Sequence, residues 1–156
     1  MTIEYIVGDA TVPRASGLKI IVHCCNSIGA WGAGFVMALS RKWDAPERQY
    51  RSWFLEHDLP QMGDVQFVPV GNKIIVANLI GQKGVKGPGN ETPVSYDAIR
   101  KGMETVAKHA KKHHASVHMP RLGCGLAGGS WDRIEPILED TLDELMVRVY
   151  DLPTGE

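Results

Sequence analysis

Two glycine-rich stretches of this 156-residue chain carry side chains that could do chemistry. The first, residues 22–37, contains the run His-Cys-Cys-Asn followed by three spaced glycines, and the second is residues 120–131. The first opens within the apolar run 19–25 and the second follows the apolar run 116–119; each run predicts a buried strand, and each stretch leads into a pattern that predicts a helix. Unpaired N–H groups at a helix N-terminus bind anions, and glycine lets a phosphate approach the backbone closely. We therefore expect two phosphate-binding loops; tight turns are the alternative.

The second stretch matches a dinucleotide-binding fingerprint, but the match fails in its context. Gly123, Gly125 and Gly128 give the spacing G-x-G-x-x-G between a predicted strand and a predicted helix. That fingerprint belongs to the first βαβ unit, and the acidic ribose ligand expected about 20 residues later has no strand end here, since Asp143 falls within a predicted helix. Because ligands of α/β sheets gather at the carboxyl ends of strands, both loops can serve one ligand. Two loops suit a pyrophosphate.

Alternating strands and helices must position these loops, which predicts an α/β fold with helices on both faces of a sheet. Residues 80–93 are polar and glycine-rich, which predicts either a flap over a site or a plain surface loop. Thr92-Pro93 predicts the cap and first turn of the third helix, and Asp132 with Glu135 predicts a capping box for the fourth. The expected strands are 3–7, 19–25, 64–70, 73–79, 116–119 and 146–150, and the expected helices are 35–43, 47–57, 93–113 and 132–145.

Composition excludes several classes of function. A hydrophobic content of 44%, a charged content of 22% and a net charge of −1 are ordinary for a globular protein and predict no polyanionic partner. Three cysteines form no disulfide framework, the N-terminus lacks a signal peptide, and no apolar run approaches membrane-spanning length. We expect a single cytoplasmic domain over residues 1–156, with no membrane partner, cofactor or metal. His109 and His113 have metal-ligand spacing but no acidic or cysteine partner nearby.

Three side chains near the predicted site have two interpretations each. Asp9 could accept from an exocyclic amine such as that of adenine, or cap a turn. Asn26 could bind sugar hydroxyls, or hold its own turn. His23 could act as a general acid or base, or be a hydrogen-bonded core histidine. Cys25, like Cys124, is expected to be a buried inert thiol.

Taken in order, these residues resemble the macro domain family. The resemblance rests on Gly8-Asp9, a strand ending in Asn26, Gly32-Ala33-Gly34 and the loop 123–129, and it covers essentially the whole chain. It implies a three-layer α/β/α sandwich with a central mixed sheet that binds ADP-ribose. In that family Asp9 would hold the adenine amine and Asn26 the distal ribose. The ligand-binding residues it implies are Asp9, Ala10, Asn26, Trp31, Gly32, Ala33, Gly34, Phe35, Gly123, Cys124, Gly125, Leu126, Ala127, Gly128 and Tyr150.

Within the family, the chain is most similar to the branch of ADP-ribose 1''-phosphate phosphatases and terminal ADP-ribose protein glycohydrolases. The glycohydrolases use a lysine nucleophile and an acid, but Gln82 and Ala127 occupy those positions here, with Lys83 one residue late. The resemblance therefore favours hydrolysis of ADP-ribose 1''-phosphate, with Asn26 and His23 as catalytic residues. Removal of ADP-ribose from protein or nucleic acid, using Lys83 or substrate-assisted water, is one alternative. A non-catalytic reader of ADP-ribose is another.

Overall fold

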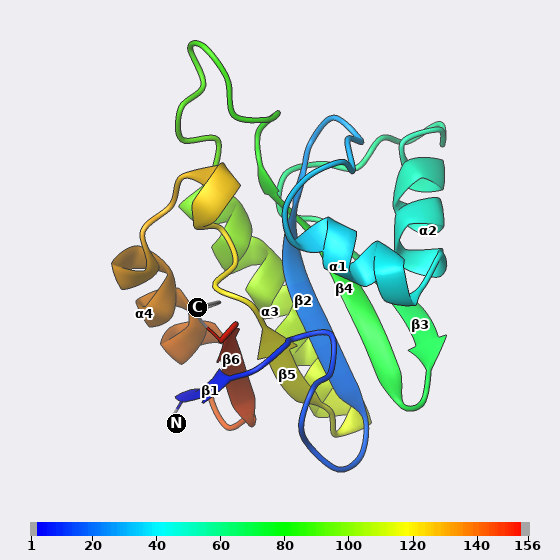
Figure 1. Ribbon diagram of the computed structural model, residues 1–156, viewed down its shortest axis with the longest axis vertical. Helices are drawn as coiled ribbons and strands as arrows, with labels where there is room; N and C mark the ends of the chain where they lie inside the picture. Colours follow the sequence, from blue (N-terminus) through cyan, green and yellow to red (C-terminus); the bar gives the residue numbers. More distant parts are fainter. Residues whose placement is uncertain (1–2, 154–156) are drawn as a thin grey trace.

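Six strands of the chain form one mixed sheet, shown in Figure 1. The computed structural model describes residues 3–153. The strand order is β1-β6-β5-β2-β4-β3, and all neighbours are parallel except the antiparallel pair β3 and β4. The strands are β1 Ile3–Val7, β2 Lys19–Asn26, β3 Val65–Gly71, β4 Ile74–Gln82, β5 Ser116–Met119 and β6 Val147–Asp151.

Helices cover both faces of the sheet. Helices α1 (Phe35–Lys42) and α2 (Ala45–Trp53) enclose one apolar core, and α3 (Tyr96–His113) and α4 (Trp131–Thr141) enclose the other. Alternate residues of β2 serve the two cores: Ile20 and Val22 pack toward α3 and α4, whereas Cys25 packs toward α1 and α2. The predicted three-layer α/β/α sandwich with a mixed sheet is confirmed.

The predicted hairpin between β3 and β4 is present, but its second strand is longer than expected. Asn72 and Lys73 both have positive φ, 51° and 59°, as the tight hairpin turn requires. β4 continues past residue 79 to Gln82, so the start of the predicted loop is buried strand. A β-carbon at Gly81 would lie 2.5 Å from Ile99 Cδ1, so glycine is what lets α3 pack against this strand.

Helices α2, α3 and α4 begin or end at other residues than predicted; α2 begins at Ala45 and not at 47, and α4 ends at Thr141 and not at 145. α3 is capped by Ser95, whose Oγ accepts from the Ala98 N–H at 3.1 Å, and not by Thr92. α4 begins one residue before Asp132, so the predicted capping box is wrong, and Pro136 lies inside the helix. α2 ends at Trp53, before the polar segment 55–61.

Because five strands are parallel, the segments that follow β2, β4 and β5 leave the sheet at one edge, the upper edge in Figure 1. The glycine-rich loops follow β2 and β5, and the segment 83–93, which we call the flap, follows β4, the neighbour of β2 on the side away from β5. Within residues 3–153, no helix is both long enough and apolar enough to cross a membrane.

Candidate ligand-binding site

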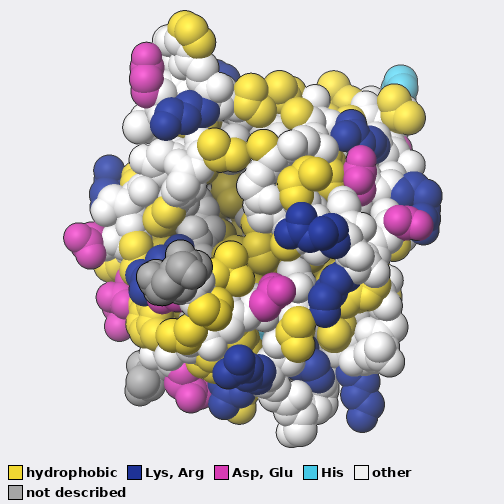
Figure 2. Space-filling model, in the orientation of Figure 1, with side chains coloured by type: hydrophobic (Ala, Val, Ile, Leu, Met, Phe, Trp, Pro, Cys, Tyr) yellow, Lys and Arg dark blue, Asp and Glu magenta, His cyan; other side chains and the backbone are white. Residues whose placement is uncertain are grey.

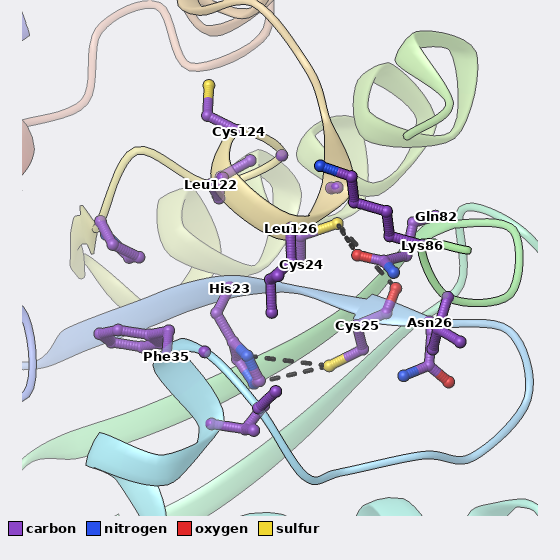
Figure 3. A pocket seen from close by; sticks show the side chains of 18 of the residues that line it. His23, Cys24, Cys25, Asn26, Phe35, Gln82, Lys86, Leu122, Cys124 and Leu126 are labelled. Carbon is purple, nitrogen blue, oxygen red and sulfur yellow. Dashed lines mark hydrogen bonds between the residues drawn. The ribbon is translucent and has the colours of Figure 1, made fainter. Parts of the chain in front are cut away.

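A cavity of about 650 Å³ lies between the two glycine-rich loops. This volume is in the range of small-molecule sites. Figure 2 shows the hollow on this face, with hydrophobic side chains around it, and Figure 3 shows its side chains from close by. Of the residues predicted to bind ligand, it is lined by Asn26, Trp31, Gly32, Ala33, Gly34, Phe35, Gly123, Cys124, Gly125, Leu126 and Ala127. Both loops therefore face one site, as the strand ends predict.

Asn26 holds the first loop in shape with most of its hydrogen-bonding groups. Its Oδ1 accepts from the N–H groups of Ile28 and Ala30 at 3.1 and 3.0 Å, and its Nδ2 donates to Ala30 O at 2.7 Å. The Tyr50 hydroxyl donates to both the Asn26 carbonyl and Oδ1, at 2.7 and 2.9 Å. The expected acceptor for a sugar hydroxyl is thus already occupied. One Nδ2 hydrogen remains for a ligand.

The first loop ends at an uncapped helix N-terminus that opens into the cavity. Gly34 is the N-cap of α1, with φ of 83°, and no side chain among residues 3–153 caps the first N–H groups of the helix. The first turn contains no acidic residue. Free N–H groups and the positive end of the helix dipole favour a bound anion here.

The second loop depends on glycine at positions where a side chain would be strained or would clash. Gly123, Gly125 and Gly128 have φ of 76°, 54° and 75°, in the left-handed region. The Gly129 N–H donates to the Gly123 carbonyl at 2.8 Å, and a β-carbon at Gly129 would lie 2.2 Å from that oxygen. Residues 125–127 form a single 3-10 turn facing the cavity.

His23 also borders the cavity, but its contacts are those of a core histidine. It is 1% exposed, its Nε2 lies 2.5 Å from Asn78 Oδ1, and its ring packs edge-on against Trp31. Burial lowers the pKa of His23 to about 4, although the bond to Asn78 opposes the shift. The ring is neutral at pH 7, with its Nε2 hydrogen donated to Asn78. This geometry argues against the predicted role of His23 as a proton donor.

The cavity thiols are held protonated, as expected for Cys25 and Cys124. Burial raises the pKa of Cys24 to about 12 and raises the pKa of Cys25 well above its ordinary value. Burial also raises the pKa of Cys124. Since the thiolate is the nucleophile, these cysteines are not activated for chemistry.

Charge at the cavity is positive. The side chains of Lys86 and Arg121 line it, and none of its lining residues within the described part of the chain is Asp or Glu. Arg121 forms a bidentate pair with Asp151, at 2.7 and 3.0 Å, which raises the pKa of Arg121 and lowers that of Asp151. An anionic ligand fits this charge distribution.

Other predicted site residues lie outside the cavity lining. Asp9 Oδ1 accepts from the N–H and hydroxyl of Thr11, at 2.8 and 2.7 Å, so it holds a turn after β1. Ala10 is buried beside it, and Gly128 lies behind the second loop, near Thr92. Their ligand roles stay predictions.

Tyr150 and Lys83 also lie outside the cavity lining. The Tyr150 hydroxyl accepts from the Arg14 N–H and lies 2.8 Å from His118 Nδ1, deep below the surface. Lys83 is exposed on the flap. A nucleophilic role for Lys83 has no support in this geometry.

The cavity lining also contains residues that were not predicted to bind ligand: Cys24, Cys25, Ala30, Val36, Gln82, Val85, Lys86, Pro120, Arg121 and Leu122. Val85 and Lys86, on the flap, were signalled only by the glycine-rich composition of 80–93, which predicts a flap but no particular side chain.

Among residues 3–153, no group of three or more His, Cys, Asp or Glu side chains is arranged to hold a metal ion. His109 instead stacks on Phe67, with ring centroids 3.9 Å apart.

Comparison with solved structures defines the class of protein. No family model matches the chain. The chain is 52% identical to a Bacteroides thetaiotaomicron protein of unknown function, over 97% of this chain and 99% of that one, with a TM-score of 0.93. It is 46% identical to a macrodomain protein from Streptomyces coelicolor, over 96% and 99% of the two chains, with a TM-score of 0.84. The chain belongs to the macrodomain family.

Two curated relatives differ in how much of their length is matched. The chromodomain-helicase-DNA-binding protein 1-like of Danio rerio is 32% identical over 90% of this chain, which spans only 14% of that protein. The ADP-ribose 1''-phosphate phosphatase of Lodderomyces elongisporus is 28% identical over 96% of this chain and 98% of that protein.

Proposed function

We propose that this macrodomain binds ADP-ribose and hydrolyses ADP-ribose 1''-phosphate to ADP-ribose and phosphate. One observation carries the proposal: two glycine-rich loops, one ending at an uncapped helix N-terminus, face a single cavity with cationic and no acidic side chains. Such a site suits a diphosphate with further phosphate at one end. The relative named as a phosphatase, matched over 98% of its length, supports the same substrate.

Hydrolysis of a phosphomonoester fits a site without a carboxylate. Water attacks phosphorus, the bond between phosphorus and the 1'' oxygen breaks, and the released oxygen takes a proton from water. The transition state is loose, so catalysis comes mainly from positioning and from stabilising charge on the phosphoryl oxygens. The N–H groups at the start of α1 and the free Nδ2 hydrogen of Asn26 supply donors for both tasks.

The adenine end of the ligand is placed toward β1 and β6 in this proposal. Asp9 follows β1, and only its Oδ1 is used in the turn with Thr11. Its second carboxylate oxygen is the proposed acceptor for the adenine amine. Tyr150 would contribute through its ring, since its hydroxyl is already bonded.

A second candidate is an ADP-ribose reader without catalysis, whose partners would be ADP-ribosylated macromolecules. The observation in its favour is the same lack of acids and bases: no carboxylate lines the cavity and His23 is neutral and bonded to Asn78. Removal of ADP-ribose by a lysine nucleophile is the least supported, because Lys83 lies outside the cavity lining and Ala127 holds the position of the acid.

We place the protein in a reducing compartment such as the cytoplasm. Cys24, Cys25 and Cys124 are all free thiols, and two of them are adjacent in the chain. Disulfides persist mainly in oxidising compartments, so free thiols favour a reducing one.

Phosphorus NMR of ADP-ribose 1''-phosphate mixed with the protein tests both candidates in one tube. The phosphatase predicts inorganic phosphate at catalytic protein concentrations, with the rate lost in Asn26→Ala and kept in His23→Gln. Lys83→Ala, an exposed residue outside the cavity, is the matched control and should not change the rate. Shifted diphosphate resonances without release of phosphate would exclude the phosphatase and leave the reader or removal of ADP-ribose from macromolecules, and unshifted resonances would refute ADP-ribose binding. A melting curve for each variant separates lost activity from lost folding.

A further inference from the structure

The two cations that line the cavity differ in whether their charge has a partner. The Arg121 guanidinium is bonded to Asp151 and lies over the rings of Tyr5 and Trp131, 5.0 and 5.4 Å from their centroids. Within residues 3–153, the Lys86 ammonium has no hydrogen-bond acceptor, carboxylate or aromatic ring as partner. A lysine without a partner at the edge of an anion site leaves its charge available to a ligand.

The flap holds the backbone of Lys86 in a fixed place. The Asn90 Nδ2 donates to the carbonyls of Lys83 and Val85, at 2.9 Å each, and so closes the flap across its own base. The Gly84 N–H donates to Ser27 Oγ at 2.9 Å, which ties the flap to the first glycine-rich loop. With the flap in this conformation, Lys86 lines the cavity.

The strand order assigns Lys86 to one end of the cavity. β4 pairs with β2, with Gln82 opposite Asn26, so the flap rises next to Asn26. Arg121 follows β5 and bonds to β6, on the side of the sheet where β1 leads to Asp9. In Figure 3 the Lys86 side chain runs from the flap toward the loop that carries Cys124 and Leu126. Lys86 therefore lies at the end of the cavity away from Asp9.

We propose that Lys86 binds the terminal phosphate of ADP-ribose 1''-phosphate and so determines the preference of the site for this ligand over ADP-ribose. The inference rests on the proposed function, which places adenine toward Asp9 and the distal ribose toward Asn26. The ammonium donates to the phosphoryl oxygens from the flap side, while the N–H groups of α1 donate from the other side. Arg121, already paired, is left at the adenine end.

The test compares two ligands in four proteins: wild type, Lys86→Ala, Lys86→Arg and Lys83→Ala. Where phosphate is released, the KM for ADP-ribose 1''-phosphate and the inhibition constant of ADP-ribose are measured in one assay. Where no phosphate is released, the Kd of each ligand is measured by calorimetry. Lys86→Ala should raise the KM or Kd for ADP-ribose 1''-phosphate by about tenfold or more, the usual effect of losing a charge-assisted hydrogen bond. It should raise the inhibition constant or Kd of ADP-ribose by less than about twofold.

The controls make each result decisive. Lys86→Arg should keep most of the preference for ADP-ribose 1''-phosphate over ADP-ribose because it keeps the positive charge. Lys83→Ala should match wild type. An equal loss for both ligands in Lys86→Ala, or no loss for either, would overturn the assignment and leave ADP-ribose binding intact. If neither ligand binds the wild-type protein, the proposed function itself fails, and the role of Lys86 with it.

Discussion

The two fully buried histidines predict that this protein loses stability steeply just below neutral pH. His23 and His118 are 1% and 0% exposed, and burial lowers the pKa of each to about 4. In the unfolded chain both titrate near pH 6.5. Between these values the unfolded state binds more protons, so the free energy of unfolding falls as the pH falls. Their stabilising contribution is complete above the unfolded value.

The size of the loss follows from the two pKa values. From pH 7.5 to pH 5, each histidine should remove about 2 kcal/mol from the free energy of unfolding, and the pair about 4 kcal/mol. That loss is large against a typical total of about 5–15 kcal/mol. The window lies above the ordinary pKa of Asp and Glu, so paired carboxylates such as Asp151 contribute little to it.

Urea unfolding at several pH values measures this effect, and two variants assign it. His23→Gln keeps a donor for Asn78 Oδ1, and His118→Asn keeps an acceptor for the Tyr150 hydroxyl, while neither titrates. Between pH 7.5 and pH 5, the free energy of unfolding of each variant should fall by only about 2 kcal/mol. A wild-type stability that is flat over this range, or unchanged pH dependence in His23→Gln, would refute the reasoning. His23 would then have a pKa suited to acid–base catalysis.

Three further changes test how the loops and the α3 interface are built. Gly125→Ala places a side chain at a φ of 54° with no steric neighbour, so it should lower the free energy of unfolding by about 1–2 kcal/mol and weaken ADP-ribose binding. The control is Gly32→Ala, which has no positive φ and should melt like wild type. Tyr50→Phe removes the hydroxyl bonded to Asn26 and should cost about 1 kcal/mol in urea unfolding; unchanged stability would show that this bond adds nothing. Gly102→Ala places a β-carbon 2.4 Å from a side-chain atom of β4 and should destabilise by about 1–3 kcal/mol by overpacking, and a higher melting temperature would contradict that geometry.

The sequence predicted the parts of the site that depend on the backbone. A strand, then glycine, then an amphipathic helix has one common geometry, so both loops and their shared sheet edge could be placed from patterns alone. Ser95 was missed as a cap because the Thr92-Pro93 pair offers the same local signal three residues earlier. Only tertiary contacts decide between them, such as the bond from the Val94 N–H to the Ala127 carbonyl.

The roles of individual side chains were harder to predict from the sequence because they depend on partners distant in the chain. Asn26 is the same residue type whether it binds a sugar or holds a turn, and only the hydroxyl of Tyr50 and the nearby N–H groups show that its oxygen is occupied. Burial keeps His23 neutral, and its hydrogen-bond partner, Asn78, lies 55 residues away in the chain. Lys86 was hidden among the lysines of the flap until the strand order placed it at the cavity.

The parallel pairing of β1 with β6 has a consequence for the order in which the molecule is assembled. β1 is an edge strand that pairs with β6 and no other described strand, with Ile3 opposite Val147. During synthesis β1 leaves the ribosome first but has no partner until β6 follows, and such distant pairings form slowly. The strands that carry both glycine-rich loops and the flap can pair earlier. A nascent chain would therefore present both loops before the segment at Asp9 is fixed beside them.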